Sequence, residues 1–523
     1  MSPKVPHVRL DEKELEFARN HIKRFYASDF FPDVPEFEAI WASWPSFKEA
    51  LKARSVSSLG HPPLLMAAPK SGGGYRLIHQ LQPYDALIYT ALAHRIAAAV
   101  EERRPKVAEE IVCSYRIALT DDGQFFEGNH DGYSTFFRRS SELADENDNV
   151  LSVDIAGFFN HIYIHRLQNS IEQCGTEYRD LSIAIEEFLL NLNQRQSVGI
   201  PIGPAASIIF SEAVLIDVDE FVRTNFEGIE YVRYVDDFRI FSNSRALLDR
   251  VHHELTSYLY RAHRLTLATG KSRLWESNDF KESVLEPPED AERKALQAEF
   301  SSLVLDAGTP YDDHDDTETN IEWDDAPADV RVDAIKRLFH TLLNRPTLDL
   351  GLARHILRRS RRYRMRNILP DVIDNATFLL PVFRDVGLYW KGVLSPSAIH
   401  EVIPKFESLI TTPITNIPFA RYWLRWLFAS KAGFSESRKI EQFVMGTPID
   451  LRAQALYART NKRESWVKKN KDEWANLGSW DRRALILAGE ALSTNERNVW
   501  MDSVQRARTG LLDEIVAKYV RSK

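Results

Sequence analysis

The stretch Tyr234-Val235-Asp236-Asp237-Phe238 constrains the fold more than any other part of this chain. It lies between two short apolar runs, 231–234 and 238–241, so the sequence predicts a β-hairpin with two adjacent carboxylates at its tip. Such carboxylates repel each other unless a cation neutralises them. The expected cation is Mg²⁺, with Mn²⁺ as the alternative, because a hard ion prefers a few carboxylates plus substrate phosphates. An aspartate pair is also ordinary turn chemistry, so the assignment needs further residues.

A second carboxylate follows a short strand. The residues 150–153 are mostly apolar and lead into Asp154-Ile155, and the run 160–167 beyond them predicts a helix. This order places Asp154 at a strand end, where it can meet the hairpin pair across a sheet. Carboxylates so placed can hold two ions about 3.5 to 4 Å apart for an in-line displacement.

Two more segments complete the series. Gly199-Ile200-Pro201-Ile202-Gly203-Pro204 precedes the run 205–222, whose apolar residues recur at helical spacing. Pro204 therefore predicts a helix start. Behind the hairpin, 265–268 predicts a short strand that is followed by a turn carrying Lys271.

In this order the segments resemble motifs A, B, C and D of the reverse transcriptases. Upstream, Pro69-Lys70-Ser71-Gly72-Gly73-Gly74-Tyr75-Arg76 resembles the basic fingers hairpin of that family, and Cys113-Ser114-Tyr115-Arg116 resembles the motif after it. The resemblance spans about residues 60 to 275 and implies an α/β right-hand fold with palm and fingers.

The resemblance also implies roles in the chemistry. Asp154 and Asp236 would hold both metals, with Asp237 as an auxiliary ligand and the carbonyl of Ile155 as a further one. Lys271 would donate a proton to the leaving pyrophosphate. The alternative for Lys271 is a solvated turn lysine.

The implied substrate is a deoxynucleoside triphosphate. Lys70 and Arg76 would grip its phosphates, and Gly199 and Pro201 would line its site. The ring of Phe159 would leave no room for a 2′-hydroxyl. The alternatives are that Phe159 is core packing and that Arg76 pairs with an acidic neighbour.

One departure narrows the resemblance. Many templated enzymes have glutamine before the motif B glycine, where this chain has Val198. With Arg233 before the hairpin tyrosine, the pattern is more similar to the bacterial abortive-infection and defence-associated reverse transcriptases. This implies anti-phage defence and self-assembly into a homo-oligomer. It also implies template-independent synthesis that a protein hydroxyl primes, so that the single-stranded DNA product stays attached to the protein.

The priming residue that we predict is Tyr26, in an amphipathic stretch ahead of the fingers; an anchored core tyrosine is the alternative. Another interpretation is an RNA-templated enzyme that works with a dedicated non-coding RNA. A non-catalytic scaffold is a third, which the intact aspartates disfavour.

The composition fits these classes. A chain of 523 residues is long enough for two to four domains, and two cysteines make a disulfide framework improbable. No targeting segment and no apolar membrane span is evident, so we expect a cytoplasmic protein without a membrane partner. The net charge of −8 argues against a basic nucleic-acid coat, but a polymerase depends on the charge local to its groove.

The second half of the chain changes in texture. We predict a reverse-transcriptase-like domain over 1–300, an acidic linker over 301–327, and a wholly α-helical domain over 328–523, arranged as an irregular HEAT-like repeat. Within this domain Arg354, Arg358, Arg361 and Arg362 belong to the densest basic cluster, which predicts nucleic-acid binding. A solvated face is the alternative. The aromatic run 422–428 is expected to be core.

Overall fold

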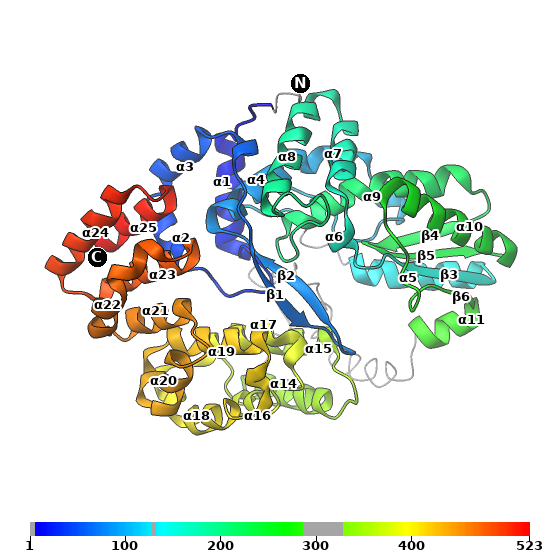
Figure 1. Ribbon diagram of the computed structural model, residues 1–523. Coiled ribbons are helices and arrows are strands. Elements are labelled where there is room, and N and C mark those ends of the chain that lie inside the picture. The colour runs from blue at the N-terminus through cyan, green and yellow to red at the C-terminus, as the bar shows by residue number, and fades with distance from the viewer. Residues whose placement is uncertain (1–5, 128–131, 286–327) are drawn as a thin grey trace. The chain divides into compact units, whose positions relative to one another are not determined.

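The chain forms two compact units in the computed structural model, which describes residues 6–127, 132–285 and 328–523 (Figure 1). The first unit combines Met1–Ala27, Lys52–Pro63 and Asp85–His314, and the second combines Ser28–Leu51, Leu64–Tyr84 and Asp315–Lys523. The chain therefore passes between the units several times.

The expected single boundary near residue 300 differs from this division. Residues 28–51 and 64–84 pack with the C-terminal helices instead: Glu38 accepts hydrogen bonds from Arg459 at 2.6 Å and from the hydroxyl of Tyr519 at 2.9 Å. Contacts between residues more than 400 positions apart leave no local mark in a sequence, which is why the pattern did not reveal them. The predicted linker 301–327 lies outside the described residues, and the domain roles stay a prediction.

The first unit is built around a four-stranded antiparallel sheet in the order β4-β5-β3-β6. Its strands are β3 (Asn149–Asp154), β4 (Glu230–Tyr234), β5 (Asp237–Ser242) and β6 (Arg273–Glu276). Side chains alternate between the faces of a strand, so Val150, Val232 and Phe241 share one face. There they pack with Phe136 and Leu143 of α5 (Gly132–Glu146) in one buried cluster.

The predicted hairpin and the strand before Asp154 are thus confirmed. The predicted strand over 265–268 is wrong in its extent: only Leu267 forms an isolated bridge, with Ile155, and the strand β6 begins after the lysine turn. Gly270 and the polar residues around it favour a turn at this point, which shifts the pairing toward the C-terminus.

The remaining elements of the first unit are helical. They are α1 (Glu12–Phe25), α4 (Pro83–Arg103), α6 (Phe158–His161), α7 (Ile164–Gln173), α8 (Arg179–Leu192), α9 (Ala206–Asn225), α10 (Arg245–Tyr258) and α11 (Ser277–Phe280). The helix α10 packs against β3 and β5, and α9 begins two residues after Pro204, close to its predicted start.

The second unit is helical apart from a two-stranded hairpin, β1 (Leu64–Pro69) and β2 (Tyr75–Gln80). Its helices are α2 (Glu36–Ala42), α3 (Trp44–Lys52), α14 (Ala328–Leu343), α15 (Leu350–Arg362), α16 (Leu369–Asp374), α17 (Phe383–Val393), α18 (Pro396–Leu409), α19 (Pro418–Ser430), α20 (Arg438–Met445), α21 (Leu451–Thr460), α22 (Glu464–Asn470), α23 (Ser479–Ala488), α24 (Thr494–Ala507) and α25 (Leu511–Arg521). The helical texture predicted beyond 328 is confirmed, and the HEAT-like repeat stays a prediction. No helix in the described part of the chain is long and apolar enough to cross a membrane.

Candidate active site

Three carboxylates meet at one end of the sheet in the first unit. Asp154, the last residue of β3, is directly opposite Asp237, the first residue of β5. The Ile155 amide donates a hydrogen bond to the Asp236 carbonyl at 3.2 Å, which ties the segment after β3 to the hairpin tip. The Ala268 amide donates to the Asp154 carbonyl at 2.7 Å, so the turn that carries Lys271 joins the same end. Four of the predicted catalytic residues are thereby brought together.

The electrostatics of this cluster are those of crowded acids. Burial, and then repulsion from Asp154, raises the pKa of Asp236 to about 7. Burial likewise raises the pKa of Asp237, although the charge of Arg239 opposes the rise. Lys271 Nζ lies 2.9 Å from Asp154 Oδ1 and offsets part of the repulsion. A raised carboxylate pKa beside other carboxylates indicates a place where a further positive charge would be stabilised.

The donor set at this end of the sheet fits a divalent ion such as Mg²⁺. Asp154 and Asp236 offer carboxylate oxygens, and the carbonyl oxygen of Ile155 accepts no hydrogen bond from any described residue. Neither here nor elsewhere do the described residues contain a group of three or more His, Cys, Asp or Glu side chains arranged to hold a metal by themselves. That absence is compatible with Mg²⁺, which keeps several waters and uses substrate phosphates instead of an all-protein cage.

Phe159 lies in the short helix α6, between β3 and α7. Its side chain is half-buried, whereas the neighbouring Phe158 is 2% exposed and belongs to the core. The Ile200 amide donates to the Phe159 carbonyl at 2.9 Å, so the glycine-rich loop is adjacent to Phe159. Phe159 is therefore not as fully buried as the alternative of plain core packing would predict.

Glycine is required at position 199. Gly199 has φ +92°, and a Cβ there would approach the carbonyl oxygen of Asn160 to 3.1 Å. Val198, immediately before it, is 44% exposed. Pro201 accepts a hydrogen bond from the Ser207 hydroxyl, which fixes the loop to the start of α9. The segment from 198 to 201 therefore presents backbone and an apolar side chain next to Phe159.

Lys70 and Arg76 lie on the β1–β2 hairpin of the second unit. Both side chains are exposed, and the Lys70 amide closes the glycine turn by donating to the Gly74 carbonyl at 3.1 Å. Neither cation forms an ion pair with an acid within the described ranges, so the alternative of a neutralised Arg76 is not observed there. Their contact with a triphosphate stays a prediction.

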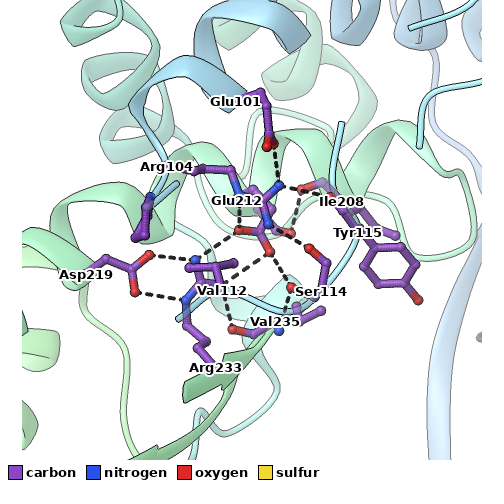
Figure 2. A network of polar contacts seen from close by, with 12 residues as sticks. Glu101, Arg104, Val112, Ser114, Tyr115, Ile208, Glu212, Asp219, Arg233 and Val235 are labelled. Atoms are coloured by element: carbon purple, nitrogen blue, oxygen red, sulfur yellow. Dashed lines mark hydrogen bonds and ion pairs between the residues drawn. The ribbon is translucent and has the colours of Figure 1, made fainter. Parts of the chain in front are cut away.

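A buried ionic network behind the hairpin was missed by the sequence analysis (Figure 2). Arg233 of β4 donates to Glu212 and Asp219 of α9, with its Nη2 at 3.0 and 2.6 Å from their carboxylates. Arg104 Nε lies 3.1 Å from the same Glu212. All four side chains are nearly inaccessible to water. Acids in an otherwise apolar helix are rarely buried without partners, and this was the signal available in the sequence.

Arg354 and Arg358 of the arginine cluster have an acidic partner within the second unit, and their contact with nucleic acid stays a prediction. Both lie one turn apart on α15 and face Asp385 of α17, at 3.7 and 3.3 Å, and Arg358 is 9% exposed. Arg354 and Arg358 lie on the face of α15 that packs against α17, so their guanidinium groups link the two helices. Arg361 and Arg362 are partly exposed, and their contact with nucleic acid stays a prediction.

Two further predictions can be placed. Tyr26 is the residue that ends α1, and it is half-buried with φ 70° and ψ 161°, a backbone region that only glycine adopts readily. Its role in priming is untested by this geometry. The aromatic run 422–428 is core as expected, with Trp423 at 1% and Trp426 at 8% exposure.

Comparison with known proteins assigns the class. Residues 68–298 match the family model described as reverse transcriptase (RNA-dependent DNA polymerase). The matched segment contains the end of β1, the hairpin turn and β2, together with the three carboxylates and Lys271. The chain thus carries a reverse transcriptase domain, and it is an enzyme of the nucleotidyltransferase class.

Among solved structures, the chain is similar to telomerases. For telomerase from Candida albicans in complex with a TWJ fragment of telomeric RNA, the identity is 12%, with 79% of this chain and 71% of that chain covered at a TM-score of 0.30. For telomerase from Candida tropicalis with the same RNA fragment, the values are 13%, 75%, 68% and 0.32. The apo telomerase from Candida tropicalis gives 10%, 69%, 68% and 0.32. No curated protein sequence matches the chain.

Proposed function

We propose that this enzyme polymerises deoxynucleotides at the site formed by Asp154, Asp236 and Asp237. The observation that carries the proposal is the direct pairing of Asp154 with Asp237 across β3 and β5; burial, and then repulsion from Asp154, raises the pKa of Asp236 beside them. Carboxylates so crowded are stable as anions only beside cations. In a nucleotidyl transfer, the metal ions that bind with the triphosphate would be these cations.

The residues divide the work as follows. Asp154 and Asp236, with the carbonyl of Ile155, would hold Mg²⁺, and Asp237 adds negative charge beside them. The bound ions would orient the triphosphate and neutralise the charge that develops in an in-line displacement. Lys271 is 67% exposed in its side chain, so it can turn from Asp154 toward the leaving pyrophosphate and donate a proton there.

We infer that substrate selection rests on Phe159 of α6 and on the glycine-rich loop next to it. The ring of Phe159 is half-buried, its carbonyl accepts the Ile200 amide of the glycine-rich loop, and it would lie beside the sugar of a nucleotide whose phosphates were bound at the aspartates. A ring at that place excludes a 2′-hydroxyl and selects deoxynucleotides. Lys70 and Arg76 are exposed, and we propose them as ligands of a triphosphate.

For the start of synthesis, we infer a protein-primed and template-independent reaction, with an RNA-templated reaction guided by a non-coding RNA as the second candidate. The exposed Val198 supports the first, because an apolar side chain replaces an amide next to the glycine that backs Phe159. Tyr26 is the proposed nucleophile. Its backbone lies in a region that is unfavourable for residues other than glycine, and such strained residues cluster at functional sites.

The test is product analysis. Purified protein is given dNTPs and Mg²⁺, with and without added RNA, and the product is run on a denaturing gel before and after protease digestion. DNA made without RNA and released only by protease supports protein priming. DNA that appears only with RNA and migrates freely favours the templated candidate. Absence of DNA under both conditions overturns the polymerase proposal.

The biological setting that we propose is bacterial anti-phage defence by abortive infection, in the cytoplasm, by a homo-oligomer. Support comes from the motif pattern around Val198 and Arg233 alone. Bacteria that express the chain should survive phage challenge as a culture better than bacteria that express Asp236→Asn. Equal phage titres from both would overturn the defence role without touching the polymerase proposal, and light scattering of the purified protein gives the oligomeric state.

A further inference from the structure

The hairpin that carries Asp236 has an unfavourable backbone conformation at its tip. Tyr234 pairs with Asp237, so Val235 and Asp236 form a two-residue loop, and Val235 has φ 52°. A β-branched residue in this region is a genuine outlier, and glycine is favoured at the first position of such loops when φ is positive. Something in the surroundings must therefore hold Val235 in place.

The two peptide groups beside Val235 are both held by buried polar side chains (Figure 2). The Val235 amide donates to Ser114 Oγ at 3.0 Å, and Arg233 Nη1 donates to the Val235 carbonyl at 3.0 Å. Ser114 Oγ in turn donates to Glu212 Oε1 at 3.1 Å, and Glu212 accepts from Arg233. Ser114, Arg233 and Glu212 each have 0% exposure, so water does not compete for these bonds.

Ser114 is itself fixed by its backbone. The Cys113 amide donates to the Arg233 carbonyl at 2.9 Å and the Arg233 amide donates to the Ile111 carbonyl at 2.7 Å, so this segment runs beside β4. Arg104 Nη2 donates to the Ser114 carbonyl at 2.7 Å. The Ser114 hydroxyl is thus oriented toward Val235 by the backbone contacts of its segment and by its hydrogen bond to Glu212 of α9.

From these contacts we propose that Ser114 and Glu212 are positioning residues, which hold Val235 in its left-handed conformation and thereby set the place of Asp236. With Val235 in that conformation, the carbonyl of the next residue, Asp236, accepts a hydrogen bond from the Ile155 amide, which joins the hairpin tip to the end of β3. Released from Ser114, Val235 would relax to negative φ, and Asp236 would move away from Asp154. The inference rests on the proposed role of Asp236 in nucleotidyl transfer.

The experiment compares Ser114→Ala, Val235→Gly and the double variant Ser114→Ala/Val235→Gly in steady-state dNTP incorporation with Mg²⁺. We expect Ser114→Ala to lower kcat by about tenfold to a hundredfold with little change in KM, because the site is misplaced in a fraction of molecules while the phosphate contacts persist. Glycine adopts positive φ without strain, so the double variant should recover most of the lost kcat.

Ser182→Ala is the matched control. The Ser182 hydroxyl is also fully buried, accepts one hydrogen bond, from Gln168 at 2.9 Å, and donates one, to the Arg179 carbonyl at 2.7 Å, but it lies in α8. Its loss should leave kcat unchanged. An unchanged kcat in Ser114→Ala, or a loss that Val235→Gly does not rescue, would overturn the positioning role. Full activity of Asp236→Asn would instead overturn the proposed catalytic site, so the two failures are distinguishable.

Discussion

Replacing Glu212 by Gln should destabilise the first unit by about 3 kcal/mol. The substitution keeps the shape but removes the charge that faces two buried guanidiniums, Arg233 at 3.0 Å and Arg104 at 3.1 Å. Breaking a buried pair by removing one partner costs about 3–5 kcal/mol, because the other charge is left uncompensated. We take the lower end, since Asp219 and Glu101 still pair with these arginines. A domain is stable by only about 5–15 kcal/mol, so the loss is large.

The measurement is hydrogen exchange of the amides in α9 and β4, followed by mass spectrometry over a urea series. Local probes are needed because the two units need not unfold together. Glu230→Gln is the control: Glu230 begins β4 with a 47% exposed side chain, 3.6 Å from Arg139, and an exposed pair is worth about 0–1 kcal/mol. A loss for Glu212→Gln no larger than that of the control would refute the reasoning.

The pH dependence gives the same prediction a second test. Burial would raise the pKa of Glu212, but the charges of Arg104 and Arg233 outweigh it and hold the pKa below its usual range. The carboxylate therefore contributes stability that is fully present above the unfolded pKa of 4.5 and is lost as pH falls through the lower folded pKa. The stability gap between wild type and Glu212→Gln should be full at neutral pH and should narrow in acid.

Three other variants give four further predictions. Asp236→Asn should lower synthesis by about a thousandfold, because the metals supply several kcal/mol to the transition state, and activity near wild type would contradict the metal assignment. Without metal, Asp236→Asn should be at least as stable as wild type above about pH 7. Because the pKa of Asp236 is raised in the folded state, ionising Asp236 costs stability as pH rises from 3.8 to about 7. Melting curves in EDTA measure this difference. Phe159→Val should raise ribonucleotide over deoxynucleotide incorporation by about tenfold, and an unchanged ratio in competition assays would assign the ring to packing. Arg358→Ala should cost about 2 kcal/mol in urea unfolding through the loss of a buried charged hydrogen bond, whereas the exposed Arg366→Ala should cost about 0.5 kcal/mol or less, and equal costs would be unexpected.

The geometry of the candidate active site could be predicted because each of its segments specifies its own secondary structure locally. A short apolar strand that ends in Asp154, and a Tyr-x-Asp-Asp string between two β-rich runs, each specify their own secondary structure. The order of the segments then left few ways to pair the strands, and the register Asp154 to Asp237 follows from antiparallel pairing of β3 with β5. The metal-binding chemistry expected of these acids also depends on residue type more than on detail.

The division into units and the fate of the arginines could not be predicted in this way. Arg354 and Arg358 carry the same composition signal as the exposed Arg364 and Arg366, and only the packing of α15 on α17 decides which of them meet Asp385. Similarly, nothing near Glu38 in the sequence indicates that its partners are Arg459 and Tyr519. Side chains that are satisfied by distant partners are invisible to a reading that proceeds along the chain.

The buried network stands between these two cases, and it shows where a sequence reading can be extended. Glu212 and Asp219 are acids seven residues apart, two helical turns, in a largely apolar run, and Arg233 follows in the strand before the aspartates. Because a buried charge without a partner would cost several kcal/mol, two acids on one face of a core helix imply a cation that the fold must bring to them. Arg233 was a candidate, because it lies in a predicted strand where its own burial would require an acid. The same argument explains why the network is joined to the active site: the arginine that satisfies α9 is one residue before Tyr234 and two before Val235, so the ionic core and the catalytic hairpin cannot move independently.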